Sequence, residues 1–446
     1  MRRSAARMPT HPHSPPRVKR SPAGRVRPMT EDDLGKLAAM TISNLPVGPA
    51  AESQRPLPDL VEQLRPYDPD LVVHDPGGPA ECVVRGGELL VAADKAELVR
   101  DGLRRWVDGE QTHDQLGVTR LRLRPAERGH CVELAAEAAT AAGTTGPSSV
   151  QPNHVHFGSP VLHGTPLLQD TPAPVGPELD RPGEPVPPAP ADEVWEPAVT
   201  VAVLDTGLDP HPWFAGRTWF SEWGLSPEVL DADDDAGQDR HAGHGTFIAG
   251  ILLQHAPGVT LRHQRVLSSL GITDDVTVMG GLRRVRRRAA GSGEHVHAVV
   301  LSSGCLTADN ACPPLLRREV LAYRDATVVA AAGNLGSDRP FWPAALPEVL
   351  AVSAIDAAGR RPGFANHGPW VDAAAPGVDV ASSFVQLRPG AGYHAPGTEH
   401  RRYGFARWSG TSFAAPRIAA ELALLRRNGV TAEAARAEVL RHFPAR

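Results

Sequence analysis

The chain has 446 residues, 41% of them apolar, which is enough for two or three domains and at least one large core. It carries 46 Lys and Arg against 51 Asp and Glu, and the net charge of −5 gives no support to a nucleic-acid or anionic-membrane partner. Four cysteines are too few for a disulfide framework and lack the spacing of a metal site.

Residues 1–65 are Pro-rich with little hydrophobic periodicity, and we predict a disordered tail. The first thirty residues contain no apolar stretch typical of a signal peptide, although Met29 is an alternative start. No segment approaches eighteen consecutive apolar residues, so we expect no membrane span. We therefore expect a cytoplasmic protein with free thiols, although Cys305 and Cys312 are close enough in sequence to pair in an exported chain.

Residues 66–157 alternate between strand-like and helix-like patterns, which predicts a small α+β domain. The expected elements are a strand or hairpin at 82–93, an amphipathic helix at 94–107, a strand at 118–125, a segment at 131–142 that fits either strand or helix, and a short final strand at 153–157.

Residues 158–195 read as an extended Pro-rich linker, and a different pattern begins at about 196. Apolar strands are expected at 199–205, 297–303, 326–334 and 348–355, with helices at 245–253 and 278–288. Continuous apolar strands that alternate with helices predict a mostly parallel sheet covered on both faces. Functional groups in such sheets gather beyond the carboxyl ends of the strands.

Two motifs place polar side chains beside apolar segments. The sequence VAVLDTGLDP puts Asp205 directly after four apolar residues, where a partly buried carboxylate needs a cation or a hydrogen-bond donor. The sequence GHGTFIAGILL puts His244 between two glycines at the start of an apolar helix, from which an imidazole can project into a cleft. The alternatives are that Asp205 caps a turn and that His244 is structural.

Two further motifs lie nearer the C-terminal end. In AAAGN, Asn334 ends a strand, where its amide could donate to a developing oxyanion or could simply occupy a turn. In GTSFAAP, Ser412 stands where a helix begins, which is also a usual place for a capping serine. A serine becomes a nucleophile only with a base, a group that orients the base, and donors for the oxyanion.

In chain order the four motifs give Asp205, His244, Asn334 and Ser412. This set resembles the subtilisin-like (subtilase) serine peptidase family, whose triad has the order Asp, His, Ser. The resemblance covers about residues 196–430. It implies an α/β fold with a subtilisin-like, mostly parallel sheet and helices on both faces, preceded by a small α+β propeptide-like domain. It also implies a serine endopeptidase that forms an acyl-enzyme and needs no cofactor.

The resemblance assigns a role to each of the four residues. Asp205 would orient the base, His244 would be the general base, Ser412 the nucleophile, and Asn334 an oxyanion donor together with the backbone N–H of Ser412. Residues 301–304 resemble the family's edge segment that pairs with extended substrate. The implied substrate-binding residues are Leu301, Ser302, Ser303, Gly304, Ala332 and Gly333, and Phe341 would lie near the floor of the pocket for the residue before the cut.

The chain also departs from secreted subtilisins. The segment after His244 is shorter and lacks their strong calcium-binding loop, and we assign no metal site. The acidic run at 231–239 could bind a cation, but a solvated loop explains it better. The domain at 66–157 stands in the place of a propeptide, so we expect it to occupy the cleft and inhibit the peptidase intramolecularly. The alternative is an unrelated adaptor domain, which would show the same alternation of strands and helices.

Three readings of the function stay open. The first is a general endopeptidase acting on peptide or protein substrates. The second is a narrow-specificity peptide-maturation protease, or a transpeptidase if water is kept from the acyl-enzyme. The third is a non-catalytic pseudo-enzyme that only binds extended peptides.

Overall fold

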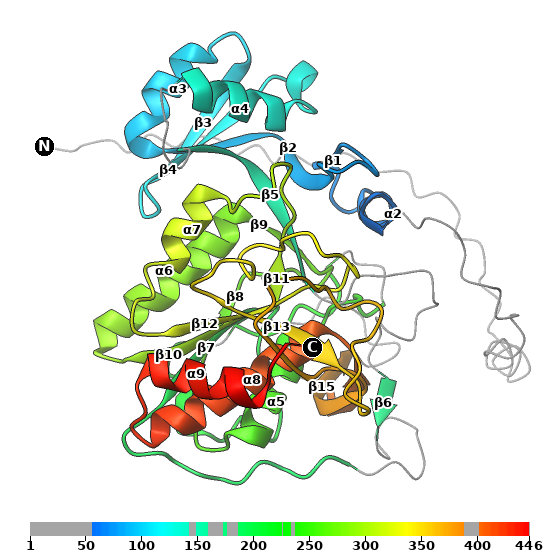
Figure 1. Cartoon of the computed structure of the whole chain (residues 1–446), viewed down its shortest axis with the longest axis vertical. Coiled ribbons are helices and arrows are strands. Elements are labelled where there is room, and N and C mark those ends of the chain that lie inside the picture. Colours follow the sequence, from blue (N-terminus) through cyan, green and yellow to red (C-terminus); the bar gives the residue numbers. More distant parts are fainter. Residues whose placement is uncertain are drawn as a thin grey trace, which may run out of the picture. The chain divides into compact units, whose positions relative to one another are not determined.

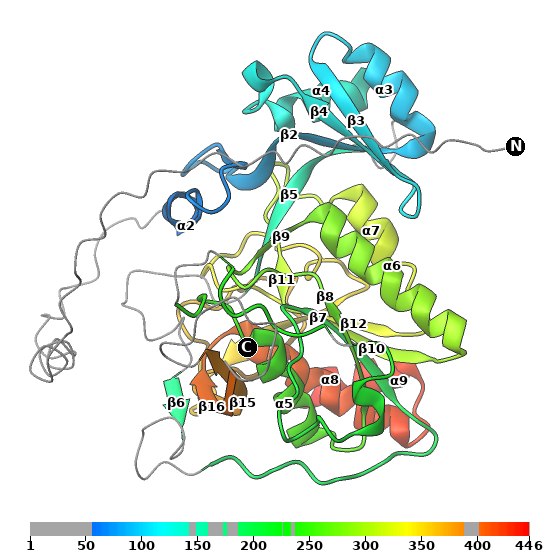
Figure 2. The ribbon, with the colours of Figure 1, turned by 180° about the vertical axis from the view of Figure 1, so that it is seen from behind.

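The computed structural model describes residues 56–141, 149–158, 173–175, 186–224, 226–232, 237–387 and 401–445. Figure 1 shows the chain coloured along the sequence, and Figure 2 shows it from behind. The blue and cyan N-terminal part forms an antiparallel sheet with two helices on one face. The remainder is built on a central parallel sheet.

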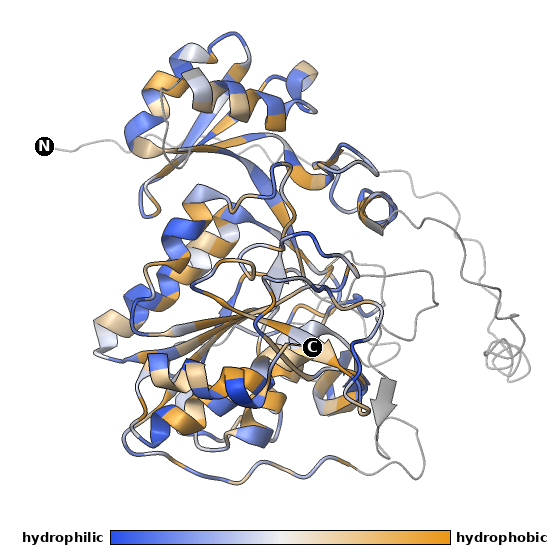
Figure 3. Cartoon of the chain, viewed as in Figure 1, coloured by the Kyte–Doolittle hydropathy of each residue, from blue (hydrophilic) through white to orange (hydrophobic). Residues whose placement is uncertain are grey.

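The N-terminal sheet has the strand order β3-β4-β2-β5, with every neighbouring pair antiparallel. Its elements are α2 (Pro56–Leu64), β1 (Leu71–His74), β2 (Cys82–Ala92), η1 (Ala93–Lys95), α3 (Ala96–Gly102), β3 (Val107–His113), β4 (Val118–Leu123), η2 (Pro125–Glu127), α4 (Cys131–Ala141) and β5 (Val150–Gly158). Hydrophobic and hydrophilic residues alternate around α3 and α4 in Figure 3, as expected for helices that bury one side against a sheet.

Strand β5 extends beyond the N-terminal sheet. Its final residues pair antiparallel with β9 (Ile272–Asp274) on one side and with β11 (Ser303–Gly304) on the other. Both of these strands come from the C-terminal part of the chain. One strand therefore connects the two parts through backbone hydrogen bonds.

The central sheet has six strands, and each neighbouring pair is parallel. In spatial order the strands are β14 (Ala373–Pro376), β13 (Leu350–Ile355), β12 (Thr327–Ala331), β10 (Val296–Leu301), β7 (Thr200–Asp205) and β8 (Thr260–Arg265). Both faces are buried, which explains why the strands read as continuous apolar runs. On β7, for example, Val201 and Val203 face one core cluster while Ala202 and Leu204 face another.

Helices cover the two faces of this sheet. Core residues of α5 (His244–His255) and α8 (Thr411–Arg427) fill one cluster, and α9 (Ala432–His442) joins the same cluster. Core residues of α6 (Asp275–Ser292) and α7 (Pro314–Val320) fill the cluster on the other face. A smaller antiparallel sheet contains β15 (Val380–Leu387), β16 (Arg401–Trp408) and β6 (Ala173–Val175), and η4 (Thr218–Phe220) is a short 3₁₀ turn.

The predicted α/β class with a mostly parallel sheet covered on both faces is confirmed. Local differences occur in the N-terminal part. Helix α2 lies within residues 1–65, which the sequence pattern assigned to a disordered tail; its buried Leu57, Leu60 and Val61 pack into the N-terminal core. The ambiguous segment at 131–142 is the helix α4, and the helix expected at 94–107 ends early at Gly102 because the chain turns into the unpredicted strand β3.

No helix in the described ranges is long and apolar enough to cross a membrane. All four cysteines are free, including Cys305 and Cys312. Neither observation tests the expected cytoplasmic location, which stays a prediction.

Candidate active site

Asp205 is the last residue of β7, at the carboxyl end of a central strand of the sheet. Its carboxylate is fully buried, and Oδ1 accepts the backbone N–H of Thr206 at 2.8 Å. Thr206 in turn accepts the N–H of Gly245 on its hydroxyl at 2.9 Å, which ties the strand end to the first turn of α5. The local Asp-Thr-Gly turn therefore fixes both the carboxylate and the helix that follows it in space.

His244 is the first residue of α5 and is fully buried. The chain enters this helix through Gly243, whose φ of 85° lies in the left-handed region that favours glycine. The His244 Nδ1 lies 2.7 Å from Asp205 Oδ1. A carboxylate on Nδ1 holds a proton there and leaves Nε2 as the acceptor, which is the arrangement of an oriented general base.

The electrostatics support an ionised carboxylate. Burial alone would raise the pKa of Asp205, but the charge of His244 and the hydrogen bonds from His244 and Thr206 outweigh it, so the pKa lies below its usual value. Asp205 is therefore able to stabilise a positive charge on His244.

Ser412 lies in the first turn of α8, directly after Thr411. The backbone N–H groups of a first helical turn lack partners within the helix and form a local anion-binding end. The Ser412 hydroxyl donates to the backbone oxygen of Ser302 at 3.4 Å. His244 Nε2 has no hydrogen-bond partner in the described part of the chain, although its ring lies 5.3 Å from that of Phe413, the neighbour of Ser412. His244 therefore contacts Asp205 in this structure, whereas the Ser412 hydroxyl is hydrogen-bonded to the backbone oxygen of Ser302 rather than to His244.

Asn334 follows β12 and is held against the start of α8. Its Oδ1 accepts the N–H of Thr411 at 3.0 Å, and its Nδ2 lies beside Gly410, 3.3 Å from where a Cβ on that glycine would stand. Gly333 has a φ of 96° and donates its N–H to the Thr411 hydroxyl at 3.1 Å. The side-chain amide of Asn334 therefore lies next to the helix end that carries Ser412.

The predicted substrate edge has two kinds of residue. Leu301 ends β10 with its side chain in the core, whereas Ser303 and Gly304 form β11 and pair with β5. Ala332 continues the central sheet by donating to Val352, and its carbonyl accepts from Asn366. Phe341 packs so closely on Gly304 and Gly333 that a Cβ on either glycine would lie within 3 Å of its ring.

A family model supplies the decisive comparison: the model described as the subtilase family matches residues 196–443. The chain belongs to the subtilase family. Among curated relatives, it is 33% identical over 241 residues to the thermophilic serine proteinase of Bacillus sp. (strain AK1), which covers 51% of this chain and 52% of that protein. The chain thus spans about half the length of that relative.

Two other likenesses concern subtilisins. This subtilase is 31% identical over 239 residues to subtilisin Savinase of Lederbergia lenta, across 51% of this chain and 76% of that protein. A crystal structure of a cold adapted subtilisin-like serine proteinase matches with 26% identity and a TM-score of 0.40, over 54% of this chain and 80% of that chain.

Two residues beside the subtilase site were not singled out from sequence. His241 stacks on His244 with ring centroids 4.2 Å apart, and burial, together with the charges of His244 and Arg240, holds its pKa well below the usual value. His263 lies beside Gly245 with both ring nitrogens buried, and this burial lowers its pKa to about 4. Both imidazoles are therefore neutral neighbours of the catalytic candidates.

Glu228 is a third residue that the sequence did not reveal. It is buried, and its Oε1 accepts the backbone N–H of Thr246 at 2.9 Å and the Thr246 hydroxyl at 3.0 Å. Burial and the neighbouring charge of Asp209 raise the pKa of Glu228 to about 8. A carboxyl on this N–H holds the first turn of α5, and so the backbone of His244, in place.

The acidic run at 231–239 is described only at its ends, because 233–236 lie outside the described residues. Asp239 accepts the Ser269 hydroxyl and the N–H of Ala232 on its Oδ2. Asp231 and Asp239, at the two described ends of the run, are both buried, so the prediction of a solvated loop is wrong for these two residues.

Proposed function

We propose that this subtilase is a serine endopeptidase in which Asp205, His244 and Ser412 form the triad. The 2.7 Å contact between His244 Nδ1 and Asp205 Oδ1, with Ser412 at the adjacent helix end, carries the proposal. His244 Nε2 removes the hydroxyl proton as Ser412 Oγ attacks the peptide carbonyl carbon. This step requires a side-chain rotation of Ser412 away from the Ser302 carbonyl.

The tetrahedral oxyanion is then stabilised by Asn334 Nδ2 and the N–H of Ser412. These donors lie together because the backbone N–H of Thr411 donates to the side-chain oxygen of Asn334 and so holds this side chain at the start of α8. His244 next passes its proton to the leaving amine, and a water molecule hydrolyses the acyl-enzyme by the same base. Apart from the peptide and the water molecule, the groups in these steps are residues of the chain.

We also infer that the N-terminal domain inhibits the site in the intact chain. Strand β5 occupies the edge that the sequence assigned to substrate, since Gly158 and Phe157 pair with Ser303 and Gly304. The Gly158 N–H also donates to Gly271 at 2.9 Å. A backbone strand in this position excludes another extended peptide from the same edge.

The catalytic part of the proposal is tested by covalent labelling. A serine-directed phosphonate should add one adduct to the full chain, located at Ser412 by peptide mass spectrometry, and Ser412→Ala should abolish the label. Ser409→Ala is the matched control, because Ser409 precedes α8 and its hydroxyl accepts the N–H of Asp379. Because β5 lies along this edge in the intact chain, Phe157→Ala, which removes a buried side chain of β5 from its contact with the peptidase, is labelled in parallel. An unlabelled Ser412 in both proteins, or equal labelling of Ser412→Ala, would contradict the proposed triad.

A further inference from the structure

Strand β5 pairs as an extended segment between two strands of the peptidase, β9 and β11, and we call the place between these two strands the groove. On one side, Val155, His156 and Phe157 pair with Asp274, Thr273 and Ile272 of β9. On the other side, Phe157 and Gly158 pair with β11. The strand therefore shows which parts of the groove meet each side chain of a bound peptide.

Successive side chains of β5 point to opposite sides. Val155 and Phe157 pack in the N-terminal core cluster. Gly158 belongs to the other side, because a Cβ on it would lie 2.6 Å from His241 Nε2, next to His244. By the same alternation, His154 and His156 point to the side of β5 on which Gly158 lies beside His241.

Both histidines meet one carboxylate, that of Asp275. His156 Nε2 lies 2.7 Å from Oδ1, and His154 Nδ1 lies 2.9 Å from Oδ2. The backbone N–H of His154 and the side-chain amide of Gln151 also donate to Oδ2, at 3.0 and 2.8 Å. Four donors of β5 thus converge on one acidic side chain of the peptidase.

Asp275 is suited to hold a negative charge in this place. It is the first residue of α6 and is fully buried, and a helix N-terminus favours an anion. Burial alone would raise its pKa, but the charge of His154 and the hydrogen bonds from both histidines hold the pKa well below its usual range. Without donors from a bound peptide, this buried carboxylate would be costly.

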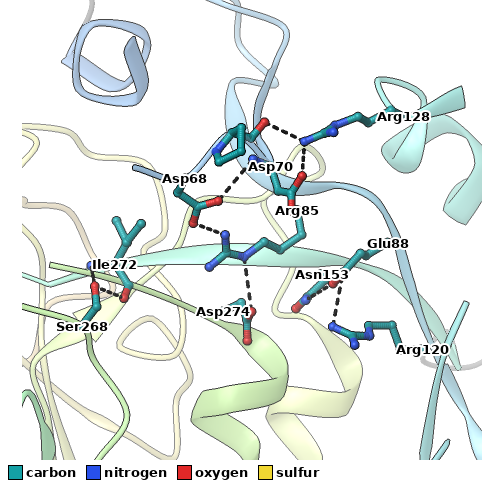
Figure 4. A network of polar contacts seen from close by, with 11 residues as sticks. Asp68, Asp70, Arg85, Glu88, Arg120, Arg128, Asn153, Ser268, Ile272 and Asp274 are labelled. Carbon is teal, nitrogen blue, oxygen red and sulfur yellow. Dashed lines mark hydrogen bonds and ion pairs between the residues drawn. The ribbon is translucent and has the colours of Figure 1, made fainter. Parts of the chain in front are cut away.

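A separate set of contacts fixes β9 to the N-terminal sheet. Figure 4 shows Arg85 of β2 between Asp68 and Asp274, with its Nε 3.3 Å from Asp274 Oδ2. Asp274 caps α6 by accepting the N–H of Thr277 at 2.9 Å. The two neighbouring acidic residues therefore differ in role. Asp274 contacts Arg85 of the N-terminal sheet and caps α6, whereas Asp275 accepts hydrogen bonds from β5.

We propose that Asp275 is a specificity-determining residue, and that the groove selects peptides with a His-X-His sequence placed as His154 and His156 are. An apolar side chain in place of His156 would leave Asp275 Oδ1 without its imidazole donor. An apolar side chain in place of His154 would remove one of the three donors to Oδ2. This inference rests on the proposed peptidase function and deepens it by naming a substrate class. Strand β5 then inhibits as a mimic of the preferred substrate.

The test compares internally quenched peptides with the full chain. The parent peptide carries the sequence of 151–158 followed by a constant Ala-Ala-Ser tail, and its partners carry Leu in place of the first, the second or both histidines. The ratio of kcat/KM between two peptides is independent of how much of the protein has its groove open, because both use the same open fraction. Casein serves as the substrate that needs no such sequence.

A buried hydrogen bond to a charged group contributes about 1.5–3 kcal/mol, so we expect the parent to be cleaved about tenfold to hundredfold faster in kcat/KM than the doubly substituted peptide. Asp275→Asn, and Asp275→Leu more completely, should remove this preference. Circular dichroism and casein turnover report whether each variant is folded. Equal kcat/KM for all peptides in the wild-type chain overturns this inference alone. No turnover of casein or of any peptide, in the wild-type chain and in Phe157→Ala alike, overturns the proposed function and this inference with it.

The same place also has metal-ligand chemistry, which the experiment separates. One ligand atom each of His156, Asp275 and Cys305 lie within 4.8 Å of one another. Under our proposal, Cys305→Ser and assays in a chelator keep the histidine preference, because the carboxylate alone recognises the imidazoles. Loss of the preference in both conditions would overturn the proposal in favour of a bound metal ion.

Discussion

His241 stacks on His244, with an angle of 27° between the rings and both side chains fully buried. The pKa of His241 is held well below its usual value, chiefly by burial and then by the charges of His244 and Arg240. His241 therefore stays neutral near neutral pH beside the candidate base His244.

This stack leads to a prediction for the pH dependence of activity. A general base must be neutral, so kcat/KM should fall on the acid side with a slope of one on a logarithmic plot. His241→Gln should keep the slope and the midpoint, because a neutral residue replaces a neutral residue. Stopped-time assays between pH 5 and 9 provide the profile, and a slope near two would show that His241 also takes up a proton.

Removal of a triad member should abolish turnover. His244→Ala is expected to lower kcat by on the order of 10⁶, since the members of a triad act as a unit. The control is Ser409→Ala, which keeps both the Ser412 hydroxyl and His244. Retention of a tenth of the wild-type kcat in His244→Ala would sink the assignment.

Asn334→Ala should act on the chemical step. Its amide helps once the oxyanion has formed, so kcat should fall roughly 10²–10³-fold with KM nearly unchanged. Steady-state kinetics on a peptide substrate separate the two constants. A change confined to KM would place Asn334 in ground-state binding instead.

Glu228 should make stability depend on pH. Burial raises its pKa from 4.5 to about 8, so within this window the folded protein holds a proton that the unfolded chain has lost. The free energy of unfolding should therefore decrease as pH rises from about 4.5 to 8, by at most about 1.4 kcal/mol per pH unit from this group.

Glu228→Gln removes this dependence while it keeps an oxygen for the N–H of Thr246. Urea unfolding at pH 5, 6.5 and 8 should give the variant a smaller loss of stability than the wild type over that range. Glu433→Gln, at the exposed start of α9, is the control and should match the wild type. Identical pH slopes in Glu228→Gln and wild type would contradict a raised pKa at this position.

The local sequence pattern was sufficient to place the four candidate residues on the fold, although their catalytic roles stay a prediction. Asp205 ends an apolar strand and Asn334 follows one, and His244 and Ser412 each lie in the first turn of an apolar helix. The parallel sheet was predictable for the same reason, because burial on both faces leaves continuous apolar runs.

Residues whose role depends on distant partners were not predictable. In the sequence, Asp275 is an ordinary acidic residue at a helix start. Its two imidazole partners come from β5, and one of them, His156, lies 119 residues away in the sequence. Glu228 stands in a loop without a motif, and its burial depends on α5. Helix α2 was missed because residues 1–65 as a whole are Pro-rich with little periodicity, although proline is well accommodated in a first helical turn.

The last prediction concerns inhibition by the N-terminal domain. Phe157 is 4% exposed and packs in one cluster with Ile272, Leu306 and Phe341, all from the peptidase part. A buried Phe→Ala change costs about 3–5 kcal/mol, and about 1.4 kcal/mol corresponds to a tenfold change, so Phe157→Ala should favour the undocked strand by roughly a hundredfold or more. The full chain should then cleave a small peptide at least about tenfold faster, until the groove is open in every molecule.

Leu98→Ala is the matched control, because Leu98 is 56% exposed on α3 and loses little on truncation. Both variants are assayed as full chains on a short quenched peptide, and intact mass is checked so that cleavage within 158–195 is not mistaken for release. Hydrogen exchange of 150–158 reports undocking independently of turnover, and should accelerate only in Phe157→Ala. If exchange accelerates while the rate of peptide cleavage stays at the wild-type value, β5 does not block the groove, and the N-terminal domain is a binding module rather than an inhibitor.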